Sequence, residues 1–195
     1  MVFPHDISVP DALHGPRVLL RPLGLDDAAE LLAAIHESRG HLTPWLPWVR
    51  HVHTIADAQA FVARTRTRWR RRTDLAMGIF ARNGGHLLGG CTLHPHDWSL
   101  RTFEIGYWLR STATGRGHAA ETVQVLTRFA FEGLTANRVE IRVDPRNAKS
   151  RAVPERLGFV YEGTLRRSAP GANGEPADRM IFALIPDDYR RLDWP

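Results

Sequence analysis

A glycine-containing loop in the middle of the chain has the composition of an anion-binding site. Gly115-Arg116-Gly117-His118-Ala119 follows a strand-like apolar run and precedes a segment with helical spacing. The first amides of a helix have no intrahelical acceptor and lie at the positive end of the helix dipole. Glycines let the backbone approach a bulky anion, and Arg116 adds a positive charge. This pattern predicts a phosphate group at the start of the helix. The alternative is a tight strand-to-helix turn without a ligand.

Two widespread phosphate-binding motifs do not fit this loop. No Lys-Ser or Lys-Thr follows Gly117, so the loop is not a P-loop. The glycine spacing differs from that of the dinucleotide-binding fingerprint, and the preceding strand follows a hairpin instead of opening a βαβ unit.

Histidine pairs are a second group of residues that could support chemistry. Two are present, His51-x-His53 and His94-x-His96. No HExxH or CxxC pattern accompanies them, so we expect no metal. His94 or His96 could instead serve as an auxiliary base. Cys91 is the only cysteine, which excludes an intrachain disulfide, and we expect it to be a small buried apolar residue.

Strand-like and helix-like segments alternate along the whole chain, which predicts one mixed α/β domain over residues 1–195. We expect strands over residues 18–22, 75–81, 86–93, 102–109, 138–143 and 179–185. Helices are expected over about 27–40, 54–72, 118–131 and 148–156.

Local signals mark several of the element ends. Asp27 and Glu30, and likewise Thr54 and Asp57, have the spacing of a capping box at a helix start. Gly40 is expected to end the first helix. Arg82-Asn83-Gly84-Gly85 predicts a hairpin between two strands.

Two segments are predicted to be irregular. Residues 41–52 carry Trp45 and Trp48 between prolines and are expected to form a rigid aromatic loop. Residues 168–178 are rich in glycine and proline and are expected to form a turn.

Composition narrows the class of protein. The 195 residues are 43% apolar and 24% charged, which is typical of a globular domain. No apolar run is long enough to span a bilayer, and no secretory signal is recognisable, so we expect a cytoplasmic protein without membrane attachment. Of 26 basic residues, 25 are arginine, and the net charge is +5. The arginine-rich run over residues 64–72 could contact RNA or an acidic partner. We favour a solvated helix face and do not expect direct nucleic-acid binding.

The loop and its surroundings resemble the GNAT superfamily of N-acetyltransferases. The strand Glu104-Ile105-Gly106-Tyr107-Trp108-Leu109 precedes the loop, and Asn147-Ala148-Lys149-Ser150-Arg151 with Leu157-Gly158-Phe159 follows it in the order of the family's motifs. Leu20-Arg21-Pro22-Leu23 and Trp45-Leu46-Pro47-Trp48 are similar to the branch of ribosomal-protein acetyltransferases (RimJ/RimL-like). The resemblance covers about residues 16–190. It implies a mixed, mostly antiparallel central sheet flanked by helices.

The resemblance implies that acetyl-CoA is the cosubstrate. Its pyrophosphate would lie on the loop formed by Thr114, Gly115, Arg116, Gly117, His118 and Ala119. Its pantetheine arm would pair with the backbone of Tyr107, Trp108 and Leu109 and contact Asn147 and Ser150. Thr114 departs from the motif, which has Gln or Arg at that position, and this puts one contact in doubt. Pro154 removes a hydrogen bond within the helix after Asn147 and predicts a kinked or very short helix there.

Catalysis in this family would require a base for the amine and a proton for the leaving thiolate. Glu104 is our candidate base, since it precedes the loop and alternates with Phe103 and Ile105 on the strand. Ser150 is the candidate proton donor. Structural roles are the alternatives: an acid paired with an arginine for Glu104, and helix capping by Asn147 next to Ser150.

The acceptor is less well defined than the cosubstrate. Trp45 and Trp48 could wall an acceptor pocket or form a small hydrophobic cluster under a loop. The resemblance favours the N-terminal amine of a protein or peptide. A small amine such as a polyamine, an amino acid or an aminoglycoside is a second option. A non-catalytic acyl-CoA-binding domain is a third. The oligomeric state is left open, with a homodimer among the options.

Overall fold

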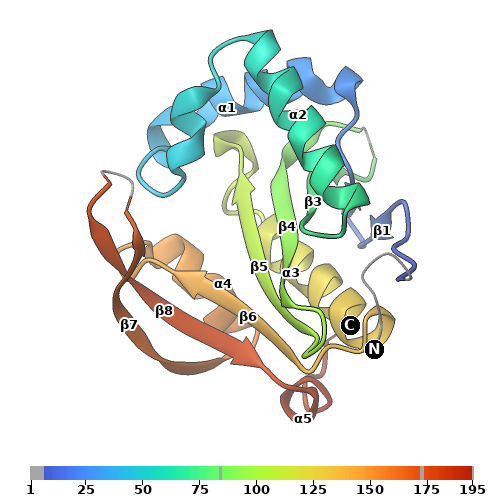
Figure 1. Ribbon diagram of the computed structural model, residues 1–195, viewed down its shortest axis with the longest axis vertical. Coiled ribbons are helices and arrows are strands. Elements are labelled where there is room, and N and C mark those ends of the chain that lie inside the picture. Colours follow the sequence, from blue (N-terminus) through green and yellow to red (C-terminus); the bar gives the residue numbers. More distant parts are fainter. Residues whose placement is uncertain (1–6, 84, 172–173, 195) are drawn as a thin grey trace.

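The computed structural model describes residues 7–83, 85–171 and 174–194, and an eight-stranded sheet runs through them (Figure 1). The strand order is β1-β2-β3-β4-β5-β6-β8-β7. Neighbouring strands are antiparallel except β5 and β6, which are parallel, so the predicted mixed and mostly antiparallel sheet is confirmed. The strands are β1 Leu13–His14, β2 Val18–Arg21, β3 Leu75–Ala81, β4 Leu87–Asp97, β5 Thr102–Leu109, β6 Arg138–Val143, β7 Val160–Pro170 and β8 Pro176–Leu184.

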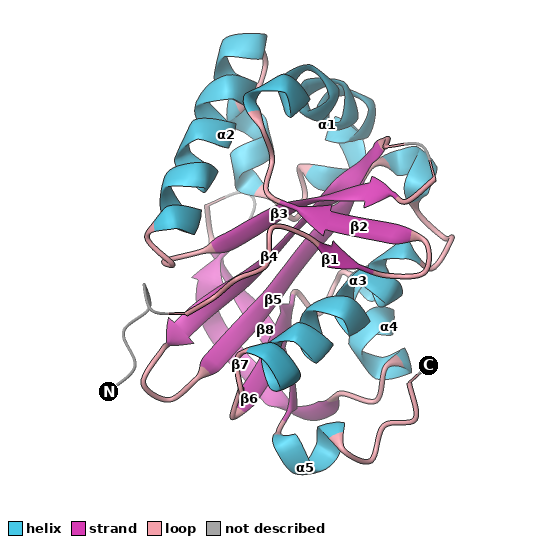
Figure 2. Ribbon diagram, turned by 90° about the vertical axis from the view of Figure 1, so that its right-hand side faces the viewer, coloured by secondary structure: helices cyan, strands magenta, loops and turns pink. Residues whose placement is uncertain are grey.

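Helices cover both faces of this sheet (Figure 2). One face packs against α1 and α2, and the other packs against α3 and α4, so the sheet separates two hydrophobic clusters. The helices are α1 Ala28–Leu42, α2 Ile55–Arg70, α3 His118–Arg128, α4 Ala148–Arg156 and α5 Pro186–Tyr189. A π-helical turn, Phe129–Gly133, continues α3.

Several predicted local signals are confirmed. The Thr54 hydroxyl accepts a hydrogen bond from the Asp57 amide, and Asp57 bonds back to the Thr54 amide, which completes the capping box of α2. The hairpin after Ala81 joins β3 to β4. The α4 helix has its predicted bounds and continues for nine residues although Pro154 lies inside it.

The first helix begins where predicted, with Asp27 at its N-cap position, but the predicted capping box and the predicted end at Gly40 are wrong. Asp27 does not form a capping box with Glu30. Its carboxylate pairs with Arg21 and accepts from the Gly24 amide. Glu30 instead accepts from the Leu87 amide. The helix also continues through Gly40 to Leu42, where the buried Leu42 side chain anchors its last turn in the core.

Both predicted irregular segments contain more regular structure than expected. Residues Pro47–His51 form a short 3-10 helix. Arg39 holds it in place, because its guanidinium donates to the carbonyls of Val49 and Val52. In the second segment, β7 and β8 stay paired as far as Pro170 and Pro176, so the turn is shorter than predicted.

The pairing between β5 and β6 ends early. Only Thr102, Phe103 and Glu104 pair with β6, and Glu104 lies opposite Glu140. Beyond that point the two strands diverge (Figure 1), and Tyr107, Trp108 and Leu109 pair with β4 alone. The last part of β5 therefore presents a backbone edge that no strand among the described residues covers.

A buried carboxylate ties the start of β2 to α3. Glu121 accepts from the amides of Arg17 at 2.6 Å and Val18 at 3.0 Å, and from Nε of Arg17 at 2.7 Å. The buried Glu121 carboxylate can stay charged because three donors form hydrogen bonds with it.

Replacing Glu121 with alanine should lower the free energy of unfolding by roughly 1–3 kcal/mol, because buried amides lose their acceptor. Denaturant unfolding measures the change. Glu155→Ala is the matched control, since it removes only an exposed i,i+4 pair with Arg151 and should cost about 0.5 kcal/mol or less. Equal stability losses in the two variants would contradict a structural role for Glu121.

Candidate active site

The glycine loop has the backbone conformation that an anion site requires. Gly115 and Gly117 have φ of 74° and 82°, a region that side chains other than glycine rarely adopt. The Glu121 amide donates to the Gly117 carbonyl at 3.1 Å. The amides of His118, Ala119 and Ala120 precede this hydrogen bond, so they have no intrahelical acceptor. These donors lie at the end of β5 that is not covered by β6.

Arg17 is a member of this loop region that the sequence analysis missed. Its Nη1 donates to the Arg116 carbonyl at 2.9 Å, and a Cβ on Gly117 would lie 3.0 Å from its Nη2. The Arg116 side chain itself is exposed. His118 Nδ1 is buried and has no hydrogen-bond partner among the described residues. Guanidinium, free amides and an unpartnered imidazole nitrogen form a donor set that fits a phosphate-bearing ligand.

The segment leading into the loop is fastened to α1. Glu37 accepts from Nε and Nη2 of Arg110 and from the amide and hydroxyl of Thr112. These hydrogen bonds lower the pKa of Glu37 to about 2, and the one from Arg110 has the largest effect. His41 contacts the Leu109 carbonyl through Nε2 at 3.1 Å. Thr114, the position that departs from the motif, donates to the Ser111 carbonyl and thus caps this turn.

Asn147 and Ser150 meet β5 on the α3 and α4 side of the sheet. Asn147 caps α4 by accepting a hydrogen bond from the Ser150 amide at 3.1 Å, so the helix-capping alternative for Asn147 is confirmed. The Tyr107 hydroxyl donates to the Ser150 carbonyl at 2.9 Å and lies 3.3 Å from Ser150 Oγ. Burial raises the pKa of Tyr107 to about 12, so the phenol keeps its proton. The Tyr107 hydroxyl is a second proton-bearing group beside Ser150, and the sequence analysis assigned it only a backbone role.

Glu104 lies on the opposite face of β5, as predicted from its alternation with the buried Phe103 and Ile105. Its Oε2 is 3.2 Å from Nε2 of His96 and 3.5 Å from Nε of Arg142. Burial raises the pKa of Glu104 above the ordinary glutamate value, against the opposing charges of Arg142 and His96. A carboxylate with a raised pKa is suited to accept a proton near neutral pH.

A network of charges extends from Glu104 onto β6. Arg142 and Arg138 donate to the two oxygens of Glu140 at 2.7 and 2.9 Å, and Arg138 also forms a two-pronged pair with Glu162. His96, Glu104 and Glu140 bring three possible metal-ligand atoms within 4.8 Å of one another. Two guanidiniums already balance Glu140, however, and nearby positive charge disfavours a bound cation. The arrangement is that of an ion-pair network.

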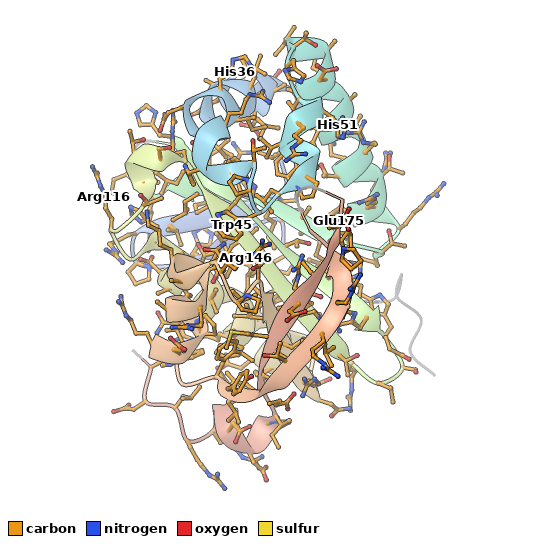
Figure 3. The ribbon with its side chains drawn as sticks, turned by 90° about the vertical axis from the view of Figure 1, so that its left-hand side faces the viewer. His36, Trp45, His51, Arg116, Arg146 and Glu175 are labelled. Carbon is orange, nitrogen blue, oxygen red and sulfur yellow. The ribbon has the colours of Figure 1, made fainter. Side chains whose placement is uncertain are left out.

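The structure separates the two tryptophans that were expected to act together. The Trp48 ring stacks on Phe61 at 4.9 Å between centroids and meets the edge of Trp108 at 6.0 Å. Trp48 therefore belongs to the hydrophobic cluster of α1 and α2, next to the strand that carries Glu104. Trp45 is half-buried. Figure 3 looks onto the side where β5 and β6 diverge and shows Trp45 there, with Arg116 and Arg146.

A cavity of about 440 Å³ adjoins the ion-pair network on the face of β6, β7 and β8. Glu140 and Arg142 belong to both the network and the cavity wall, so the cavity lies beside Glu104. Its charged lining residues are two arginines and two glutamates. The full lining is Arg138, Glu140, Arg142, Glu162, Gly163, Thr164, Leu165 and Ile181.

Among the described residues, no helix has the length and apolar character needed to cross a membrane.

Of the remaining histidines in the predicted pairs, His53 contacts the Arg50 carbonyl, and His94 lies near Asp74. Cys91 is buried, as expected.

Known proteins resemble this chain over most of its length. It is 33% identical to YdaF of Bacillus subtilis, provisionally named a ribosomal N-acetyltransferase, over 88% of this chain and 93% of that protein. It is 30% identical to the ribosomal-protein-serine acetyltransferase of Escherichia coli over 52% of this chain and 56% of that protein. The structure of Mycobacterium smegmatis RimJ in complex with CoA-disulfide matches with a TM-score of 0.84 and 28% identity, covering 94% of this chain and 91% of that one.

A family model, described as an acetyltransferase (GNAT) domain, matches residues 17–160. This range begins at Arg17, which contacts the glycine loop, and contains the loop, Glu104 and Ser150. With the fold and the donor set above, these matches show that the chain belongs to the GNAT family of N-acetyltransferases, which use acetyl-CoA as cosubstrate.

Proposed function

We propose that this protein transfers the acetyl group of acetyl-CoA to the N-terminal amine of a protein or peptide. The observation that carries the proposal is the divergence of β5 and β6 directly after Glu104 and Glu140. It leaves a gap in the strand pairing, with Glu104 on one face of β5 and the Ser150–Tyr107 pair on the other. An amine and a thioester that meet in this gap would have a base on one side and a proton donor on the other.

The cosubstrate would extend from the glycine loop toward this gap. Its pyrophosphate would accept hydrogen bonds from the loop amides, with Arg17 and Arg116 nearby. Its pantetheine amides would pair with the uncovered backbone of Tyr107, Trp108 and Leu109, and Asn147 and Ser150 would border the arm. This assignment accounts for both the free donors of the loop and the part of β5 that does not pair with β6.

In the reaction, Glu104 would take a proton from the acceptor ammonium, directly or through water. The neutral amine would then attack the thioester carbonyl. When the tetrahedral intermediate collapses, the carbon–sulfur bond breaks and Ser150 would give a proton to the leaving thiolate. The Tyr107 hydroxyl lies close enough to Ser150 Oγ to share that proton.

The cavity beside Glu104 favours a peptide acceptor over a small polycation. A polyamine or aminoglycoside site would carry a clear excess of acidic groups, whereas this cavity has equal numbers of arginine and glutamate. The names of the relatives, which include ribosomal-protein acetyltransferases, support the same class. Trp48, next to Trp108, and Trp45 would border the acceptor on the α1 side.

A panel of acceptors tests the acceptor class. Peptides with a free N-terminus should release thiol from acetyl-CoA faster than polyamines, free amino acids or aminoglycosides, and the same peptides with a blocked N-terminus should not react. A higher kcat/KM for a small amine would overturn the peptide assignment. Binding of acetyl-CoA without turnover of any amine would favour the non-catalytic alternative.

Gly117→Asp should weaken acetyl-CoA binding by about 100-fold or more, because it places a carboxylate against the pyrophosphate. Calorimetric titration with acetyl-CoA measures this. Gly174→Asp is the matched control, since Gly174 has a similar φ of 86° and open space around it but lies in the β7–β8 turn. Unchanged affinity in Gly117→Asp would refute the loop assignment.

Glu104→Gln should lower kcat by about 100-fold and leave acetyl-CoA affinity unchanged, because it removes the base and keeps the shape. In the wild type, kcat/KM should fall as pH drops through the raised pKa of Glu104, since only the ionised carboxylate accepts a proton. Glu132→Gln, which alters an exposed pair with Tyr189, is the control. A Glu104→Gln enzyme with wild-type turnover would exclude Glu104 as the base.

A further inference from the structure

A β-bulge determines which histidine reaches Glu104. In the β4–β5 register, His94 is opposite Glu104 and Pro95 is opposite Phe103. The next pair is Asp97 with Thr102, so His96 is an extra residue without a partner. His94 is thus the cross-strand neighbour of Glu104, and the bulge comes directly after this part of the ladder. Bulges reorient side chains, and this one directs His96 toward β5 and β6.

The two histidines therefore have different partners. His96 Nε2 lies 3.2 Å from Oε2 of Glu104 and 3.2 Å from Oε1 of Glu140. His94 approaches Asp74, with 3.7 Å between Nδ1 and Oδ1. The two rings meet edge to face at 5.6 Å. His96 thus joins carboxylates on two neighbouring strands, at the last pair before β5 and β6 diverge.

The two carboxylates beside His96 differ in their ability to accept a proton. Burial opposes ionisation of Glu140, but the hydrogen bonds and charges of Arg142 and Arg138 outweigh it and lower its pKa. Glu140 is therefore a fixed anion. Burial raises the pKa of Glu104, whose only charged neighbours within ion-pair distance in the described structure are His96 and Arg142. Glu104 is the carboxylate that can exchange a proton with His96.

We propose that His96 is a positioning residue that orients Glu104 and carries its proton to solvent, a role that rests on the proposed function of Glu104 as the base. Glu104 takes the proton from the acceptor ammonium and becomes a neutral acid. It gives this proton to the free Nε2 of neutral His96, and the imidazolium, held between Glu104 and Glu140, releases one proton from Nδ1 to water. Proton exchange with water then moves the remaining proton from Nε2 back to Nδ1, so that Nε2 is free again. Glu104 is then ionised for the next turnover. The His96 side chain is 30% exposed and that of Glu104 is 28% exposed, so the imidazole has direct contact with solvent.

The surroundings of His96 favour this transfer. Glu104 faces it from β5, and Glu140 and Arg142 face it from β6. His94 lies beside it on β4. The anionic charge of Glu140 stabilises the transient imidazolium, and Arg142 keeps Glu140 ionised.

His96→Gln tests the proposal, because glutamine can hydrogen-bond to Glu104 but cannot carry a proton. We expect kcat to fall about tenfold or more with little change in KM. His53→Gln is the control, since the His53 imidazole contacts the Arg50 carbonyl, and it should keep the wild-type rate. Thermal unfolding of each variant, monitored by circular dichroism, establishes that the fold is intact.

A second variant separates proton transfer from packing. His96→Ala should be slow, and added imidazole should restore a large part of its rate. Wild-type kinetics in His96→Gln, or a slow His96→Ala that imidazole does not restore, would overturn the proposal. The assays use whichever amine the wild type acetylates best, so a wrong acceptor class leaves this test intact. A wild-type rate in Glu104→Gln would refute the base itself and is measured independently.

Discussion

The short pairing of β5 with β6 is the constraint on which the rest of the site depends. A parallel strand pair normally continues until one strand ends, because each lost rung leaves backbone groups without partners. Here the pairing stops after Glu104 and Glu140, and β5 continues for five residues with β4 alone. The exposed edge can be satisfied by the amides of a ligand arm. The glycine loop lies at the end of the same edge, so one strand aligns both ends of the cosubstrate, and its two faces carry the candidate acid and base.

Features set by short-range physics could be predicted from the sequence. The Thr54 cap, the hairpin after Ala81 and the alternation that separates Glu104 from Phe103 depend on neighbouring residues, and all three are present. The glycine loop was also recognisable, because an anion site at a helix start needs glycines and free amides within a few positions. Its resemblance to a known family then supplied the identity of the anion, which the residues alone left open.

Features that depend on contacts between distant segments could not be predicted in this way. Arg17 reaches the loop only because Glu121, 104 positions away, holds its amide and its guanidinium. Glu30 bonds to β4 instead of capping its own helix. The helix does not end at Gly40, because burial of Leu42 stabilises two further residues. The bulge at His96 changes strand register by one residue, and although His94 lies opposite Glu104 in the ladder, the imidazole that contacts Glu104 is that of His96.

The attachment of α1 to the segment before the glycine loop has a thermodynamic consequence. Glu37 and His41 bind this segment, while Arg39, on the same turns of the helix, holds the 3-10 helix that carries Trp48. The 3-10 helix that carries Trp48 and the segment leading into the glycine loop are thus both attached to α1, and together with it they form one structural unit. Where binding of one substrate shifts this unit, the same shift is no longer required when the other substrate binds. The two binding equilibria are then linked, and each substrate changes the affinity of the other by the same factor.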